Sequence, residues 1–133
     1  MKATFFAAAV LISAVSAQAD IIKCSFTEPF IETTYSMAQQ SLSYSTFTGG
    51  SKPEVRVIKN VSFQIKAAGQ FELVGKDGKV LQKLSITNRG SDGMSNRTYP
   101  YEVEDKSMGG GANSGFGGCS SNALKASDDS DSN

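Results

Sequence analysis

Three carboxylates near the end of one alternating segment are the residues best suited to chemistry. Glu102 and Glu104 would lie on one face of a strand, about 7 Å apart, with Asp105 next to them. Two carboxylates held roughly 5–10 Å apart in a cleft can cleave a glycosidic bond by acid–base catalysis. A solvated strand face gives the same pattern more often, so a carboxylate-dependent hydrolase is the less favoured hypothesis.

Other forms of catalysis are restricted by composition. The chain contains no histidine and only two cysteines. Ser-His-Asp and Cys-His mechanisms are therefore impossible within it, and we expect no zinc site. The loop around Asp92 carries several side-chain oxygens but lacks the residue spacing of a calcium-binding loop. We expect a protein that is not an enzyme and that holds no cofactor or metal.

The first nineteen residues have the three parts of a secretory signal peptide. Lys2 provides the positive charge, residues 3–15 form an uncharged apolar segment, and Ala17-Gln18-Ala19 is a small-x-small cleavage site. The apolar segment is shorter than the roughly 20 residues that span a bilayer, so we expect cleavage after Ala19 and no stable membrane insertion. A short leader with a single lysine is more typical of bacteria and predicts a periplasmic or secreted protein.

Cys24 and Cys119 most simply form one disulfide in an exported chain, with free thiols or intermolecular bridges as alternatives. This bond would close a loop of about 95 residues and would stabilise the fold by on the order of 4–5 kcal/mol. We therefore expect one domain over residues 20–119. Residues 120–133 have few apolar side chains and end in acidic ones, which predicts a disordered acidic tail.

Apolar and polar residues alternate through most of residues 20–119, as in strands with one buried face. The segments 41–47 and 61–66 are clear examples. Asp77-Gly78 lies between two alternating segments and indicates a hairpin, because glycine readily adopts the positive φ of such turns. No apolar pattern repeats at helical spacing over three turns. The sequence predicts an all-β fold, a small antiparallel barrel or sandwich of about six to eight strands.

The segment 88–101 is the best candidate for a recognition surface. A polar loop at residues 88–96 leads directly into Tyr99-Pro100-Tyr101. Aromatic side chains beside a flexible polar loop are typical of protein-binding sites. The alternative is that both tyrosines fill the core or one end of a barrel. The residues that we assign to partner binding are Ser91, Asp92, Gly93, Arg97, Tyr99 and Tyr101.

Charge gives no sign of a polyanionic partner. Basic and acidic residues number 13 each, and removal of Lys2 with the leader would leave a formal net charge of −1. The basic residues are scattered and form no stripe, so we do not expect nucleic acid to be a partner. The expected partner is a protein or a component of the cell envelope.

The layout of the chain resembles the periplasmic C-type lysozyme inhibitors of bacteria. The shared features are Cys24 near the mature start, an all-β middle, a Ser-Asp-Gly loop leading to Tyr99, and Cys119 near the end. The resemblance implies a small β-barrel that inserts a loop into the lysozyme cleft, with Ser91, Gly93 and Tyr99 carrying the binding. In that family the tyrosine follows the glycine by three positions, whereas here it follows by six.

The segment Thr27-Glu28-Pro29-Phe30 also looks like an element of uncharacterised secreted bacterial proteins, which implies no particular function. The leading hypothesis is an exported, non-enzymatic β-domain that binds its partner through residues 88–101. Lysozyme inhibition is the alternative of the same kind.

Overall fold

The computed structural model describes residues 20–26, 30–47, 52–108 and 115–128 of the 133-residue chain. The predicted leader, residues 1–19, lies outside the described residues. Within them the fold is all-β: nine strands form one antiparallel sheet, and a short tenth strand pairs with one of the nine. This architecture confirms the predicted all-β, antiparallel class, although the sheet has more strands than the six to eight expected.

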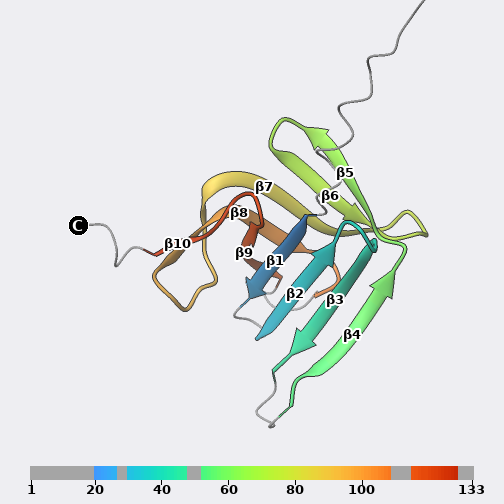
Figure 1. Cartoon of the computed structure of the whole chain (residues 1–133), viewed down its shortest axis with the longest axis horizontal. Helices are drawn as coiled ribbons and strands as arrows, with labels where there is room; N and C mark the ends of the chain where they lie inside the picture. The colour runs from blue at the N-terminus through green and yellow to red at the C-terminus, as the bar shows by residue number, and fades with distance from the viewer. Residues whose placement is uncertain (1–19, 27–29, 48–51, 109–114, 129–133) are drawn as a thin grey trace, which may run out of the picture.

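Two meanders make up the sheet. The strands are β1 (Ile21–Phe26), β2 (Ile31–Ser36), β3 (Ser41–Thr46), β4 (Glu54–Lys59), β5 (Ser62–Ala67), β6 (Gln70–Val74), β7 (Val80–Gly90), β8 (Arg97–Asp105), β9 (Phe116–Ser121) and β10 (Ser127–Asp128). Their order across the sheet is β4-β3-β2-β1-β9-β8-β7-β6-β5, with β10 beside β8 (Figure 1). The first meander, β1 to β4, therefore meets the second, β5 to β9, where β1 pairs with β9.

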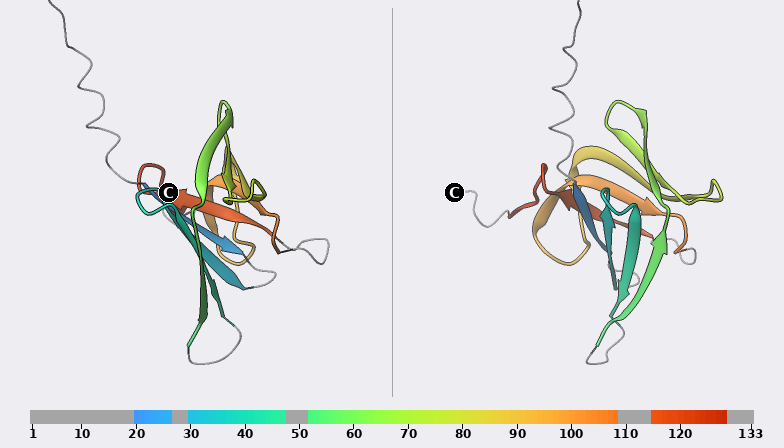
Figure 2. Two further views of the ribbon diagram at one scale, coloured as in Figure 1. Left: turned by 90° about the vertical axis from the view of Figure 1, so that its right-hand side faces the viewer. Right: turned by 45° about the vertical axis from the view of Figure 1, so that its right-hand side comes forward.

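β4 and β5, at opposite ends of this order, are joined by only Asn60 and Val61. Each antiparallel pairing reverses the strand direction, and an even number of pairings separates β4 from β5 in this order. The two strands therefore run in the same direction. They act as one bent strand that pairs first with β3 and then with β6 (Figure 2). Asn60 adopts a left-handed φ of 62°, and the Tyr35 hydroxyl donates a 2.7 Å hydrogen bond to the Val61 carbonyl at the bend. The sheet is strongly bent, but the hydrogen-bonded order ends at β4 and β5 and does not close.

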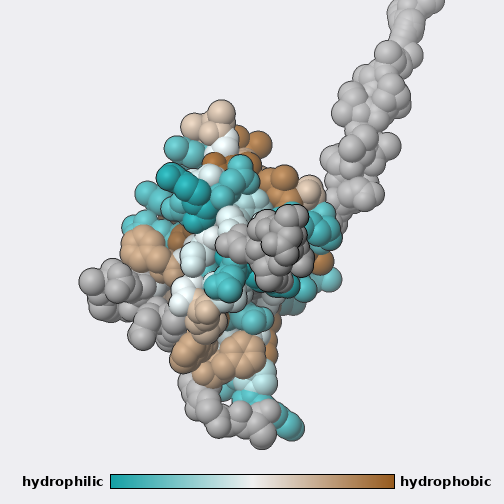
Figure 3. Space-filling model, turned by 90° about the vertical axis from the view of Figure 1, so that its left-hand side faces the viewer, coloured by the Kyte–Doolittle hydropathy of each residue, from teal (hydrophilic) through white to brown (hydrophobic). Residues whose placement is uncertain are grey.

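The strands form because their alternating side chains place apolar groups on one face. In β3, for example, Leu42 and Tyr44 are buried, while the serines that alternate with them lie on the outer face. Hydrophilic side chains accordingly cover much of the surface in Figure 3, although apolar side chains gather in its upper and lower parts. The predicted hairpin at Asp77-Gly78 joins β6 to β7, and Gly78 has the expected positive φ of 88°.

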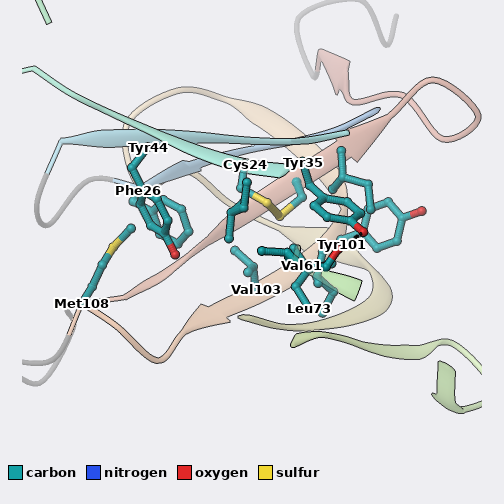
Figure 4. Packing of buried hydrophobic residues seen from close by; sticks show 13 residues of the cluster. Cys24, Phe26, Tyr35, Tyr44, Val61, Leu73, Tyr101, Val103 and Met108 are labelled. Carbon is teal, nitrogen blue, oxygen red and sulfur yellow. Dashed lines mark hydrogen bonds between the residues drawn. A yellow bond between two sulfur atoms is a disulfide. The ribbon is translucent and has the colours of Figure 1, made fainter. Parts of the chain in front are cut away.

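The core lies inside the bend of the sheet and contains the Cys24–Cys119 disulfide. The two cysteines face each other directly in the β1–β9 pairing, with a Cα–Cα distance of 4.0 Å, which confirms the predicted bond. Figure 4 shows the disulfide between two groups of buried side chains, one with Phe26, Tyr44 and Met108 and the other with Tyr35, Leu73 and Tyr101.

A polar cluster also lies within this core. The Asp105 carboxylate, with 3% of the residue exposed, accepts hydrogen bonds from the Tyr44 hydroxyl (2.7 Å) and Gln82 Nε2 (2.9 Å). Its other oxygen accepts from the backbone N–H of Ser107 at 2.8 Å. Gln82 Nε2 also donates to Thr33 Oγ1 at 3.1 Å. Burial and the nearby Asp105 charge raise the pKa of Tyr44, so this hydroxyl keeps its proton and the cluster links β2, β3, β7 and β8.

The sheet continues past Cys119, beyond the predicted domain boundary. β9 extends to Ser121, and β10 pairs with residues 97 and 98 of β8. We expected a disordered tail from residue 120 because few apolar groups are available there, but backbone pairing holds part of it against the domain. Residues 129–133 of the predicted tail lie outside the described residues.

Candidate functional site

The segment 88–101 is mostly strand. β7 extends to Gly90 and β8 begins at Arg97, so only residues 91–96 form a loop. The β7–β8 register shifts between Ile86 and Gly90, and Asn88 has a positive φ of 59°. Such an irregularity bends a strand and redirects the chain that follows it. The loop therefore leaves the sheet from a bent strand end.

Asp92 organises this loop, although only 6% of the residue is exposed. Its Oδ1 accepts hydrogen bonds from the backbone N–H groups of Met94 and Ser95, both at 2.8 Å. Its Oδ2 accepts from the hydroxyls of Ser95 (2.8 Å) and Tyr99 (3.0 Å). Burial acts to raise the pKa of Asp92, but these hydrogen bonds outweigh it and lower the pKa from 3.8 to about 2. The ionised carboxylate thus holds the loop in one conformation.

Stability should fall in acid as Asp92 takes up a proton. Because the folded-state pKa is depressed to about 2, the carboxylate stabilises the fold above the unfolded-state value of 3.8 and loses this contribution as the pH falls toward 2. The contribution at neutral pH is roughly 2 kcal/mol. Urea unfolding of the native protein and of Asp92→Asn should differ most near neutral pH, and the difference should shrink below about pH 4. A difference that does not change with pH would contradict this role.

Both tyrosines of the segment are largely buried, at 6% exposure for Tyr99 and 7% for Tyr101. The Tyr99 ring lies against Gly118, where an added Cβ would come within 2.8 Å of the ring. Burial and the hydrogen bond to Asp92 raise the pKa of Tyr99, which therefore remains a donor. Tyr101 packs in the core, with its oxygen 3.4 Å from Ser121 Oγ. Tyr101 thus packs in the core next to β9, whereas Tyr99 lies outside the core cluster, beside Gly118 and the loop.

An open groove of about 550 Å³ lies between this loop and the adjoining ends of β1, β2 and β3. Phe30, Phe47 and Met94 line it and are 53%, 43% and 57% exposed. Figure 3 shows apolar side chains gathered on this side of the molecule. Polar groups from both sides also line the groove: Ser25, Glu32, Asp92, Ser95, Arg97 and Tyr99. We call this region the Phe30 groove.

Only part of the predicted site lies in the Phe30 groove. Asp92, Arg97 and Tyr99 line it, whereas Tyr101 lies in the core. Ser91 and Gly93 are exposed, and the Gly93 N–H donates to Ser91 Oγ at 2.9 Å. Ser91 lines a second, more open hollow together with Arg89, Asn96 and other residues of the same segment.

The aromatic side of the groove was missed by reasoning from the sequence. Phe30 and Phe47 flank β2 and β3, and neither was predicted to take part in binding. Phe47 gave one usable signal, because it is out of step with the buried pair Leu42 and Tyr44. An apolar residue out of step with a buried face points toward the outer side of the sheet.

The three carboxylates of β8 do not converge. Glu102 and Glu104 lie on the outer side of the strand, whereas Asp105 is buried in the core. Neither glutamate lines the Phe30 groove. Among the described residues, no group of three or more His, Cys, Asp or Glu side chains is arranged to hold a metal ion. The same residues include no helix long and apolar enough to cross a membrane.

No protein-family model, curated protein or solved structure matches this chain. The groove combines three exposed apolar side chains with a loop fixed by a buried carboxylate. Asp92 already accepts four hydrogen bonds within the protein, so its carboxylate serves to hold the loop in place. A fixed loop beside exposed apolar side chains suits binding.

Proposed function

We propose that this protein is exported and binds a protein or a cell-envelope component without catalysing a reaction. The Phe30 groove carries the proposal, because clustered apolar side chains beside a fixed polar loop are typical of interaction surfaces. Its volume of about 550 Å³ lies within the range of ligand-binding clefts. Arg97 and Glu32 supply charged groups that would orient the partner.

Two features support export to the periplasm or the medium. Residues 1–19 have the pattern of a cleavable leader. The Cys24–Cys119 disulfide is of a kind that persists mainly in oxidising compartments. Cleavage after Ala19 would start the mature protein just before β1, so no strand would be lost.

Replacing Phe30 with serine should reduce partner capture at least tenfold and leave the fold intact, because the ring is half exposed and lines the groove. Phe116→Ser is the matched control, since Phe116 is 54% exposed against 53% for Phe30 but does not line the groove. Affinity capture from envelope extract with each tagged protein measures the effect. Equal capture by native protein and both variants would contradict the proposal, as would equal losses in both variants.

Lysozyme inhibition is a second candidate, favoured by the exposure of Ser91 and Gly93 on a loop held by Asp92. Under the resemblance described above, these residues would enter the lysozyme cleft. Turbidity of a bacterial cell-wall suspension, treated with C-type lysozyme and the pure protein, tests this candidate. Lysis at the uninhibited rate with micromolar protein present would contradict it.

A further inference from the structure

Over the part of the chain that the structure describes, the sheet ends at β5 and at β4, and these two edge strands differ in regularity. At one edge, the pairing of β5 with β6 shifts register between Ile65 and Ala67. Such irregularities hinder further pairing along an edge strand. At the other edge, β4 pairs with β3 in continuous register along all six of its residues.

The regular edge also exposes apolar side chains. Val55 and Val57 of β4 are 60% and 51% exposed and lie on the same side of the strand. Because β4 is the last strand in the order, no strand among the described residues pairs with the backbone groups on its outer edge. A regular strand with a free edge and exposed valines is a template for a further strand.

We propose that β4 pairs antiparallel with β4 of a second copy of this chain. A two-fold axis normal to the sheet would place one residue opposite itself and would pair residues at equal distances on either side, which for an axis at Val55 are residues 54 and 56 of β4. An axis at Arg56 would place the Arg56 side chains of the two copies opposite each other. An axis at Val57 would place no acidic residue opposite a basic one. An axis at Val55 places Glu54 of each copy opposite Arg56 of the other, because each lies one residue from the axis.

Charge complementarity therefore selects the axis at Val55. Two opposite-charge pairs would flank the central valine contact, and such cross-strand pairs stabilise a sheet. Glu54 and Arg56 are both exposed, and neither is in an ion pair with another described residue. The Arg56 guanidinium lies 4.7 Å from the centre of the Tyr44 ring on β3, so the pairing requires this side chain to turn toward the outer edge. No β4 residue lines the Phe30 groove, so a dimer leaves the groove open.

Sedimentation velocity of the purified protein from about 10 µM to about 1 mM tests the dimer. We expect a reversible dimer for the native chain and a monomer for Val55→Lys, which would set two like charges at the axis. Ile65→Lys is the matched control, since Ile65 is 71% exposed on the irregular edge, and this variant should still dimerise. A native protein that stays monomeric, a Val55→Lys dimer or growth into larger species would each overturn the proposal.

A charge exchange tests the register itself. Glu54→Arg and Arg56→Glu should each weaken self-association at least tenfold, because like charges would then face each other across the axis. An equimolar mixture of the two variants should form a heterodimer, because both facing pairs become opposite in charge again. A role of these side chains within the monomer alone would not produce this rescue. Failure of the mixture to associate would overturn the proposed pairing.

Discussion

Replacing Asp105 with alanine is expected to lower the free energy of unfolding by about 3–5 kcal/mol. The change would leave the Tyr44 hydroxyl and Gln82 Nε2 without the acceptor that they share in the core. A buried donor that loses its acceptor costs its full desolvation energy, which is more than the net gain from an average hydrogen bond. Urea denaturation at neutral pH measures the loss.

Glu104→Ala is the control for this change. Glu104 is the preceding residue, and its ion pair with Lys106 (3.2 Å) is exposed on both sides, so we expect a loss below about 0.5 kcal/mol. Tyr44→Phe should lie between the two, at about 1–2 kcal/mol, because it removes one donor and keeps the ring. Similar losses for the Asp105 and Glu104 variants would contradict the role of the buried cluster.

Removing the disulfide through the double change Cys24→Ala and Cys119→Ala should cost on the order of 4–5 kcal/mol. The bond joins residues 95 positions apart, so its loss returns a large conformational freedom to the unfolded chain. The alanines would also leave a small void, because the cysteines are 2% and 0% exposed in the core. Urea unfolding under oxidising conditions compares the variant with the native protein.

Reduced native protein is the control for the disulfide. It retains both sulfurs in the core, so it isolates the effect of the covalent link from the loss of packing. We expect its unfolding midpoint to lie close to that of the double variant and well below that of the oxidised protein. Unchanged stability after full reduction would show that the link does not restrict the unfolded chain.

Alternation predicts most of the sheet because most strands bury one face and expose the other. β9 carries no such alternation in its first half, because Gly117 and Gly118 have no side chains. A Cβ at Gly117 would lie 2.3 Å from the Ser25 carbonyl oxygen, and a Cβ at Gly118 would lie 2.8 Å from the Tyr99 ring. Gly117 and Gly118 therefore serve close packing between strands, which only the assembled sheet reveals.

The candidate site was predictable only along the segment that carries its loop. Asp92, Arg97 and Tyr99 are close in sequence, and polar composition with an aromatic neighbour was enough to select them. Phe30 and Phe47 join them in the groove because the bend of the sheet brings distant strand ends together. No local pattern encodes that bend, since it depends on the β1–β9 pairing and on the corner at Val61.

The β1–β9 pairing also sets the order in which the chain can finish folding. Each meander is built from hairpins between consecutive strands, which form quickly, whereas β1 must wait for the last strand of the second meander. When the chain emerges with its N-terminus first, Cys24 has no intramolecular partner until Cys119 appears. A chain threaded through a translocation pore would thus complete its sheet only on the far side, and oxidation of the two thiols would mark that moment.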